Sequence, residues 1–231
     1  MKQYSIYLMD ADDTLFDFQK AERCAFFKTF EALSGQACTQ EIYAKYSQLN
    51  RSLWEALERR EITKPQLQET RFGLFLKEQG LSGDGLVWNE TYLDHLSEGN
   101  FLFDKALEVC RELSQKAALY LATNGVTRVQ KKRLRDSAIA PYIRGIFVSE
   151  EAGAEKPSPV YFDHVMKRLG NPGKEQILMV GDSLTSDMAG GIAAGIDTCW
   201  YNPRRKPLPP SLKVTWQIHS LEQLLPPSME R

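Results

Sequence analysis

Long apolar segments are missing from this chain of 231 residues. No hydrophobic run approaches the length of a membrane-spanning helix. The N-terminal run, residues 4–9, is too short and too acidic at its end to be a signal peptide. The sequence therefore predicts a protein with no membrane partner.

Cysteine and histidine are both scarce. The four cysteines lie far apart and form no C-x-x-C pair, so neither a disulfide framework nor a zinc site is expected. A reduced, cytoplasmic setting fits this cysteine usage best. The three histidines occur in unrelated contexts, which argues against a histidine-based triad or metal site.

The chain also lacks an excess of charge of one sign, because 29 basic residues balance 30 acidic ones. This balance argues against nucleic acid as a polymeric partner, whereas a small anionic substrate would need only local positive charge. A chain of this length can hold one large domain, or a core with a smaller inserted unit. A monomer and a homodimer both remain open.

A block with helical periodicity occupies residues 18–99. N-caps are expected at Thr39 and Thr63, and helix stops at Gly35 and Gly80. No strand-like run interrupts the block, so we interpret it as a helical bundle inserted after a first strand. Its helices are expected at 19–33, 40–60, 65–79 and 84–97.

Beyond Gly99, short apolar runs alternate with helical segments, which is typical of a parallel sheet with helices on its faces. The predicted fold class is α/β, with a Rossmann-like parallel-sheet core at 1–17 and 100–231 and a helical domain inserted at 18–99. After a first strand within 4–9, strands are expected at 117–122, 145–148, 177–180, 198–201 and 214–218, and helices at 102–115, 126–137, 159–169 and 186–194.

Two carboxylates follow the first predicted strand directly. Asp10 and Asp12 are two positions apart, so in an extended segment their side chains leave the same face. Carboxylates this close repel each other, and a hard divalent cation with oxygen ligands, most simply Mg2+, would relieve that repulsion. The alternative is that the acidic cluster only caps the following helix.

Polar residues also follow three later strands. Thr123 and Asn124 end the second strand, Lys156 lies in the loop after the third, and Asp182 and Asp187 follow the fourth. The carboxyl ends of parallel strands meet at one edge of a sheet, so these groups are expected to converge. Together with the first carboxylates they meet the needs of phosphoryl transfer: a nucleophile, a proton donor, a cation and hydrogen bonders for the phosphoryl oxygens.

These residues resemble the four motifs of the haloacid dehalogenase-like hydrolases, in their Mg2+-dependent phosphatase branch. Residues 10–15 are similar to the first motif, Thr123-Asn124 to the second, Lys156-Pro157 to the third and residues 181–187 to the fourth. Order and approximate spacing both match. The resemblance covers the whole chain, because the helical insert corresponds to the cap of that family.

The resemblance implies that Asp10 is the nucleophile and forms an aspartyl-phosphate that water then hydrolyses. It implies that Asp12 protonates the leaving alkoxide and later deprotonates the water. Mg2+ would be held by Asp10, by the backbone carbonyl of Asp12 and by Asp182, with Mn2+ or Co2+ able to substitute.

The same resemblance assigns the remaining core residues. Thr123, Asn124 and Lys156 would hold the phosphoryl oxygens of a small-molecule phosphate monoester. Asp187 would either bind the metal through water or orient Lys156. Taken alone, Thr123-Asn124-Gly125 is a good turn and Lys156 is an ordinary surface lysine, so these assignments rest on the joint occurrence of the motifs.

A narrower resemblance links residues 50–54, 71–72, 148–151 and 178–182 to bacterial house-cleaning pyrimidine 5′-nucleotidases. It implies hydrolysis of nucleoside 5′-monophosphates with pyrimidines preferred, such as UMP, dUMP and dTMP. The base would be contacted by residues of the helical domain; the candidates are Phe18, Asn50, Trp54, Arg71 and Phe72. The alternative for Trp54 and Phe72 is packing in the core of that domain.

Other functions remain open at this stage. A sugar-phosphate phosphatase or a phosphomutase would use the same scaffold. Dehalogenation is disfavoured, because halide displacement needs no Mg2+ and so no aspartate at both 12 and 182. A phospho-accepting signalling domain also uses an aspartate nucleophile, Mg2+, threonine and lysine, but such domains are compact and lack an inserted helical cap.

Overall fold

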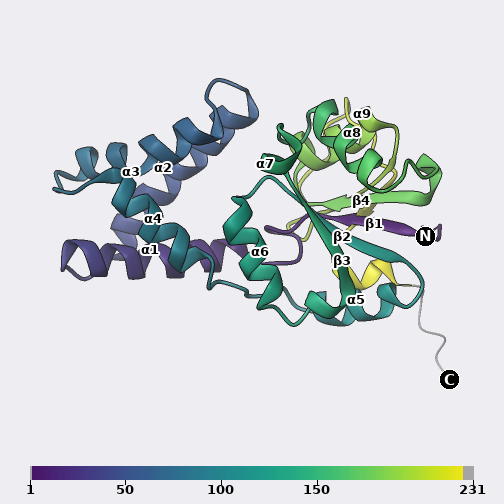
Figure 1. Cartoon of the computed structure of the whole chain (residues 1–231), viewed down its shortest axis with the longest axis horizontal. Helices are drawn as coiled ribbons and strands as arrows, with labels where there is room; N and C mark the ends of the chain where they lie inside the picture. Colours follow the sequence, from purple (N-terminus) through teal and green to yellow (C-terminus); the bar gives the residue numbers. More distant parts are fainter. Residues whose placement is uncertain (1, 226–231) are drawn as a thin grey trace. The chain divides into compact units, whose positions relative to one another are not determined.

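The computed structural model describes residues 2–225. The chain divides into two compact units, Met1–Phe18 with Asn100–Arg231 and Gln19–Gly99 (Figure 1). Within the described residues, every helix is too short or too polar to cross a membrane. The two units are described separately below.

The first unit is built on a six-stranded sheet whose order is β3-β2-β1-β4-β5-β6, and every neighbouring pair is parallel. The predicted α/β class and parallel sheet are confirmed. The strands are β1 Ile6–Met9, β2 Ala118–Thr123, β3 Ile143–Val148, β4 Ile177–Gly181, β5 Asp197–Tyr201 and β6 Trp216–Ile218.

Helices cover both faces of this sheet (Figure 1). The side chains of β1 alternate, so that Tyr7 and Met9 pack with α5 on one face while Leu8 packs with α8 on the other. The helices are α5 Ala106–Ser114, α6 Thr127–Arg135, α7 Ser149–Ala152, α8 Pro159–Arg168 and α9 Ala189–Ala194. Short helical turns occur at η1 Ala140–Tyr142, η2 Lys174–Gln176, η3 Leu184–Met188 and η4 Leu221–Leu224.

Two predicted helices differ from the structure. The helix expected at 102–115 begins only at Ala106, because Lys105 adopts a left-handed conformation with φ of 67°. The helix expected at 186–194 is divided into the π-helical turn η3 and the helix α9. The side chain of Ser183 caps η3 by accepting a hydrogen bond from the backbone N–H of Ser186.

Strand β1 lies between β2 and β4; the chain runs outward from β1 through β2 to β3 and then crosses back to β4 on the other side of β1. Such a reversal of strand order opens a crevice at the carboxyl ends of the strands, where ligands bind in open α/β sheets. Asp10 leaves β1 at that point, and its N–H donates to the carbonyl of Val180 at 2.8 Å. The fold therefore places the first acidic residue at the switch point of the sheet.

The helices of the second unit are α1 Phe18–Ser34, whose first residue belongs to the first unit, α2 Gln40–Glu58, α3 Lys64–Gln79 and α4 Gly85–Leu96. The predicted caps are confirmed: the Thr39 side chain accepts from the N–H of Ile42, and Thr63 forms a capping box with Gln66. Gly80 ends α3 with φ of 64°. Seven buried aromatic residues lie in the core of this unit: Phe26, Phe30, Tyr46, Phe72, Phe75, Trp88 and Tyr92.

Candidate active site

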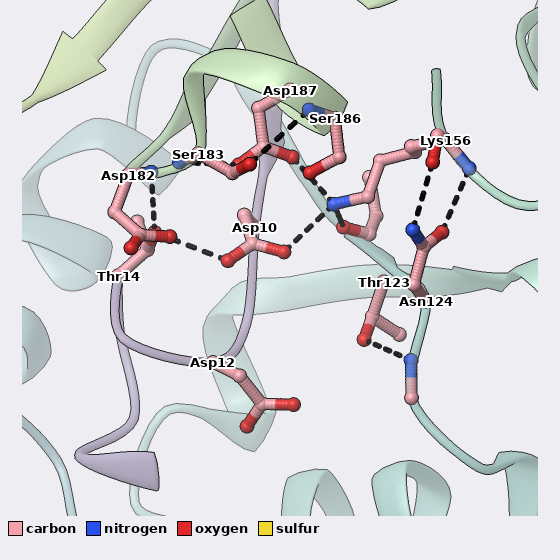
Figure 2. A network of polar contacts seen from close by, with 12 residues as sticks. Asp10, Asp12, Thr14, Thr123, Asn124, Lys156, Asp182, Ser183, Ser186 and Asp187 are labelled. Atoms are coloured by element: carbon pink, nitrogen blue, oxygen red, sulfur yellow. Dashed lines mark hydrogen bonds and ion pairs between the residues drawn. The ribbon is translucent and has the colours of Figure 1, made fainter. Parts of the chain in front are cut away.

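Polar side chains from the carboxyl ends of several strands converge at the switch point (Figure 2). Asp10 follows β1, Thr123 ends β2, and Asp182 follows β4. Lys156 comes from the loop between α7 and α8, and Asp187 from η3. Hydrogen bonds link residues that are more than a hundred positions apart in the chain.

The ammonium of Lys156 is the centre of this network, and only 2% of its side chain is exposed. Its Nζ donates to Oδ1 of Asp10 at 2.7 Å, to Oδ1 of Asp187 at 2.6 Å and to the carbonyl of Ala122 at 2.6 Å. These three bonds use all three N–H groups of the ammonium. Burial alone would lower the pKa of Lys156, but the carboxylates of Asp10 and Asp187 outweigh it and raise that pKa.

Thr14 ties the two strand ends together. Its hydroxyl donates to Oδ2 of Asp10 at 3.1 Å and accepts from the backbone N–H of Asp182 at 3.1 Å. With Lys156 on Oδ1, both carboxylate oxygens of Asp10 are therefore held in place. Thr14 is fully buried in a tight loop, in which the N–H groups of Leu15 and Phe16 both donate to the carbonyl of Ala11.

The carboxylates at this site resist ionisation. Burial raises the pKa of Asp10 from 3.8 to about 7, against the opposing charge of Lys156, and the nearby Asp187 raises it further. Burial also raises the pKa of Asp182 to about 9, with added repulsion from Asp10 and Asp187. When ionised, these three acidic groups would face a single ammonium and carry an excess of negative charge.

The donor set fits a small divalent cation. One carboxylate oxygen from each of Asp10, Asp182 and Asp187 lies within 4.8 Å of the others. Magnesium prefers oxygen ligands at about 2.0–2.1 Å, so opposite ligands lie roughly 4 Å apart, close to this spacing. A bound cation would also neutralise the excess negative charge. Two of these aspartates are predicted metal ligands, and the third, Asp187, is predicted to act through water or on Lys156.

Glycine at position 181 permits the approach of Asp187. A side-chain Cβ at Gly181 would overlap the carboxylate of Asp187. That carboxylate accepts from the backbone N–H of Ser183 at 3.2 Å through Oδ2, while Oδ1 contacts Lys156. The position and orientation of Asp187 are therefore set by the turn that follows β4.

Asp12 is bound by helix α6. Its Oδ2 accepts from Nε2 of Gln130 at 2.5 Å, and its Oδ1 pairs with the guanidinium of Arg133. Figure 2 shows the Asp12 carboxylate below that of Asp10, separated from the network of Lys156. The backbone carbonyl of Asp12, rather than its side chain, is the group predicted to reach the metal.

The second motif is placed differently from the expectation for Asn124. Its side-chain amide pairs with the backbone of Lys156, accepting from the N–H at 2.8 Å and donating to the carbonyl at 3.0 Å (Figure 2). A side chain engaged in this way holds the Lys156 loop and is not directed at a phosphoryl group. Thr123 is buried, and its hydroxyl accepts from the N–H of Gly125 at 3.0 Å.

Two of the residues predicted to contact the base lie in a buried polar network of the helical unit. The amide of Asn50 donates to Glu22 at 2.6 Å and accepts from Arg71 at 3.2 Å. Arg71 also bonds Asn89, and its guanidinium lies 4.6 Å from the centre of the Tyr92 ring. The side-chain amide of Asn50 is thus engaged by both Glu22 and Arg71, so binding a base through this amide would require an exchange of partners.

Phe72, a predicted stacking partner of the base, has no accessible surface in this structure. Its side chain is fully buried, and its neighbours include Phe26, Tyr46 and Tyr92 at centroid distances of 6.4, 5.2 and 5.4 Å. The alternative of core packing holds for this residue. Trp54 and Phe18 are only half-buried and retain exposed surface.

Sequence reasoning missed four residues that contact the predicted ones. Thr14 lies in the first motif and could have been assigned from its position four residues after Asp10. Gln130 and Arg133 are three residues apart on a basic helix, a spacing that places both on one face. Glu22 carries no local signal, because its partners come from helices distant in sequence.

A family model described as haloacid dehalogenase-like hydrolase matches residues 4–195. YfnB of Bacillus subtilis (strain 168), named as a haloacid dehalogenase-like (HAD) hydrolase, is 42% identical over 97% of this chain and 95% of its own length. The pyrimidine 5′-nucleotidase PynA of Streptococcus pneumoniae is 34% identical over 96% of this chain and 94% of its own. The pyrimidine 5′-nucleotidase YjjG of Escherichia coli (strain K12) is 32% identical over 94% and 95%.

A crystal structure of the same Bacillus subtilis protein, bound to magnesium, superposes with a TM-score of 0.90 over 96% of this chain and 97% of that one. The family model spans most of the chain, and the relatives above 30% identity align over nearly all of it. The protein therefore belongs to the haloacid dehalogenase-like hydrolases.

Proposed function

We propose that this hydrolase is a Mg2+-dependent phosphomonoesterase that hydrolyses nucleoside 5′-monophosphates and prefers pyrimidines. The observation that carries the substrate class is that two relatives named pyrimidine 5′-nucleotidases align with almost the whole chain, helical unit included. The observation that supports the chemistry is the convergence of three aspartates and a buried lysine at the switch point.

In the first step, an oxygen of Asp10 attacks phosphorus. A bond forms between that oxygen and phosphorus while the bond from phosphorus to the nucleoside oxygen breaks, and the departing oxygen takes a proton from Asp12. In the second step, water attacks the same phosphorus, its proton passes to Asp12, and the aspartyl-phosphate is cleaved. Asp12 therefore acts twice, as an acid and then as a base.

Mg2+, when bound, supplies positive charge beside the phosphoryl oxygens as negative charge develops on them. Asp10 and Asp182 would hold it, Asp187 lies close enough to join them, and the carbonyl of Asp12 would complete the protein ligands. Mn2+ and Co2+ are proposed substitutes.

Lys156 supplies a fixed ammonium that orients the Asp10 carboxylate and offsets its charge. Asn124 holds the loop of Lys156 through two backbone hydrogen bonds. We propose that Thr123, buried at the end of β2, provides the neutral hydrogen bond donor for a phosphoryl oxygen.

The helical unit is proposed to act as a cap that reads the leaving group, because the core residues can recognise only a phosphoryl group. Trp54 and Phe18 retain exposed aromatic surface, so they are the proposed stacking partners of the base. Asn50 and Arg71 are the proposed hydrogen bonders, after exchange of their partners in the Glu22 network. A signalling receiver is set aside, because the chain belongs to a hydrolase family.

The test is a phosphate-release panel with Mg2+ that compares UMP, dUMP, dTMP, AMP, GMP, hexose phosphates and an aryl phosphate. The expected order places the pyrimidine nucleotides first in kcat/KM. Hexose phosphates as the best substrates would refute the nucleotidase assignment while leaving the phosphatase assignment intact. No release from any monoester would refute both.

A further inference from the structure

Helix α6 presents two donors to the carboxylate of Asp12. Gln130 donates from Nε2 to Oδ2 at 2.5 Å, and Arg133 pairs with Oδ1. Arg133 also lies 3.4 Å from Oε1 of Gln130, so the two donors contact each other. Each oxygen of Asp12 therefore has its own donor from the same helix face.

Burial of the charged guanidinium of Arg133 costs desolvation free energy. Its side chain has no exposed surface, whereas the side chain of Asp12 is 25% exposed. A charged group is rarely buried unless it is paired, and the planar guanidinium of arginine also stacks on aromatic faces. Asp12 provides the pairing, and the ring of Phe16 supports the guanidinium at 4.8 Å from the ring centre. The first-motif loop thus contributes both the carboxylate and the platform for its partner.

The loop after β2, which carries the second motif, also leaves room for the contact between Gln130 and Asp12. A Cβ at Gly125 would overlap the side-chain amide of Gln130. Glycine at this position therefore leaves the space through which Gln130 reaches Asp12. Two loops and helix α6, all within the same compact unit, therefore contribute to the surroundings of the Asp12 carboxylate.

We propose that Arg133 and Gln130 are positioning residues that fix the direction of the Asp12 carboxylate for proton transfer at the leaving oxygen. This inference rests on the proposed function, in which Asp12 donates that proton. A carboxylate offers about four lone-pair positions, so two donors leave positions free for the reacting proton. A side chain held at both oxygens cannot rotate away from the substrate, and a misplacement of about 1 Å can cost on the order of 100-fold in rate.

The test compares two leaving groups. dTMP releases an alkoxide that needs a proton, whereas p-nitrophenyl phosphate releases a stable phenolate that needs none. The value of kcat/KM reports the steps up to formation of the phosphoenzyme and so isolates the first use of Asp12. Loss of positioning in Arg133→Met or Gln130→Met should lower kcat/KM for dTMP by about 10- to 100-fold and leave the aryl phosphate within about threefold.

Arg133→Lys, which keeps the charge without the planar fork, should recover part of the dTMP activity. The matched control is Arg135→Met, an exposed arginine of the same helix, which should leave both substrates unchanged. If Arg133→Met does not fold, Gln130→Met decides the question, because it keeps the ion pair and the approximate side-chain shape.

A double-mutant cycle with Asp12→Asn completes the test. If the donors act through Asp12, their effect on dTMP disappears in the Asp12→Asn background. An equal fall for both substrates, an unchanged dTMP rate, or a fall that persists with Asp12→Asn would overturn the positioning role. An Asp12→Asn variant with the full dTMP rate would instead refute the proposed acid, a failure of the proposed function that is distinct from the others.

Discussion

Lys156 and Asp10 are 146 positions apart in the chain, yet Nζ of Lys156 lies 2.7 Å from Oδ1 of Asp10 in a buried site. The ammonium also bonds Asp187, so one positive charge serves two carboxylates. Removal of one member of a buried ionic group leaves the others uncompensated, which costs more than the intact group contributes.

Lys156→Met should therefore destabilise the metal-free protein by about 3–5 kcal/mol and also abolish most activity. Urea unfolding monitored by circular dichroism measures the first effect. Lys132→Met is the matched control, because Lys132 pairs with Asp136 on the surface at 39% and 37% exposure, and its loss should cost less than about 1 kcal/mol. Equal costs for the two variants would contradict the role given to the buried lysine.

Asp12→Asn should slow phosphate release from nucleotides by roughly 10²–10⁴-fold or more, because an acid-base group is lost from both chemical steps. Steady-state kinetics with UMP provide the measurement, and unchanged thermal unfolding shows that the fold is kept. A variant that retains more than about a tenth of the activity would contradict an acid-base role for Asp12.

Removal of the metal by chelation should abolish phosphate release, because the three closely spaced aspartates require a cation to offset their mutual repulsion. Mg2+ should restore activity, and Mn2+ or Co2+ should restore part of it. Ca2+, with its longer and looser coordination, should bind without supporting turnover. Phosphate release measured after exhaustive EDTA treatment checks this, and full activity in metal-free buffer would exclude the metal.

The same carboxylates predict how stability depends on pH. The pKa values of Asp10 and Asp182 are raised from 3.8 to about 7 and about 9, so above roughly pH 4 the folded protein binds protons that the unfolded chain has released. The free energy of unfolding of the metal-free protein should therefore fall as the pH rises from about 4 to about 9. Melting curves with EDTA should show that fall, and Asp182→Asn should reduce it. A steady rise with pH in EDTA would be inconsistent with protons held at these sites.

Trp54→Ala should erase much of the preference for pyrimidine nucleotides. Stacking on an aromatic side chain is worth about 1–3 kcal/mol per base in single-strand binders, which corresponds to roughly tenfold to hundredfold selectivity. The ratio of kcat/KM for UMP to that for p-nitrophenyl phosphate measures the effect. Leu86→Ala, at an exposed leucine of the same unit, is the control. Equal losses for both substrates would remove Trp54 from base recognition.

The sheet and its acidic edge could be predicted from sequence, because each is encoded locally. Short apolar runs that end in polar residues predicted the strands, and parallel topology then brought Asp10 and Asp182 to one edge. The helix start at Ala106 could not be predicted, because it depends on the left-handed backbone of Lys105.

Contacts between distant segments explain the rest of the differences. Asn124 appears in sequence as a phosphate ligand, but its amide is engaged by the backbone of Lys156, 32 positions away. Phe72 has the residue type of a stacking partner, yet tertiary packing buries it in an aromatic core. The sequence places Arg133 on a basic helix and assigns it no role, since only the fold brings it to Asp12.

The central claim is that Asp10 carries the phosphoryl group. Acid quenching during turnover of a radiolabelled nucleoside monophosphate, followed by peptide mapping, tests this claim most directly. The account predicts acid-stable label on the peptide that contains Asp10, and neither label nor turnover in a folded Asp10→Asn variant. Appreciable turnover by Asp10→Asn, or label on a different residue, would contradict it.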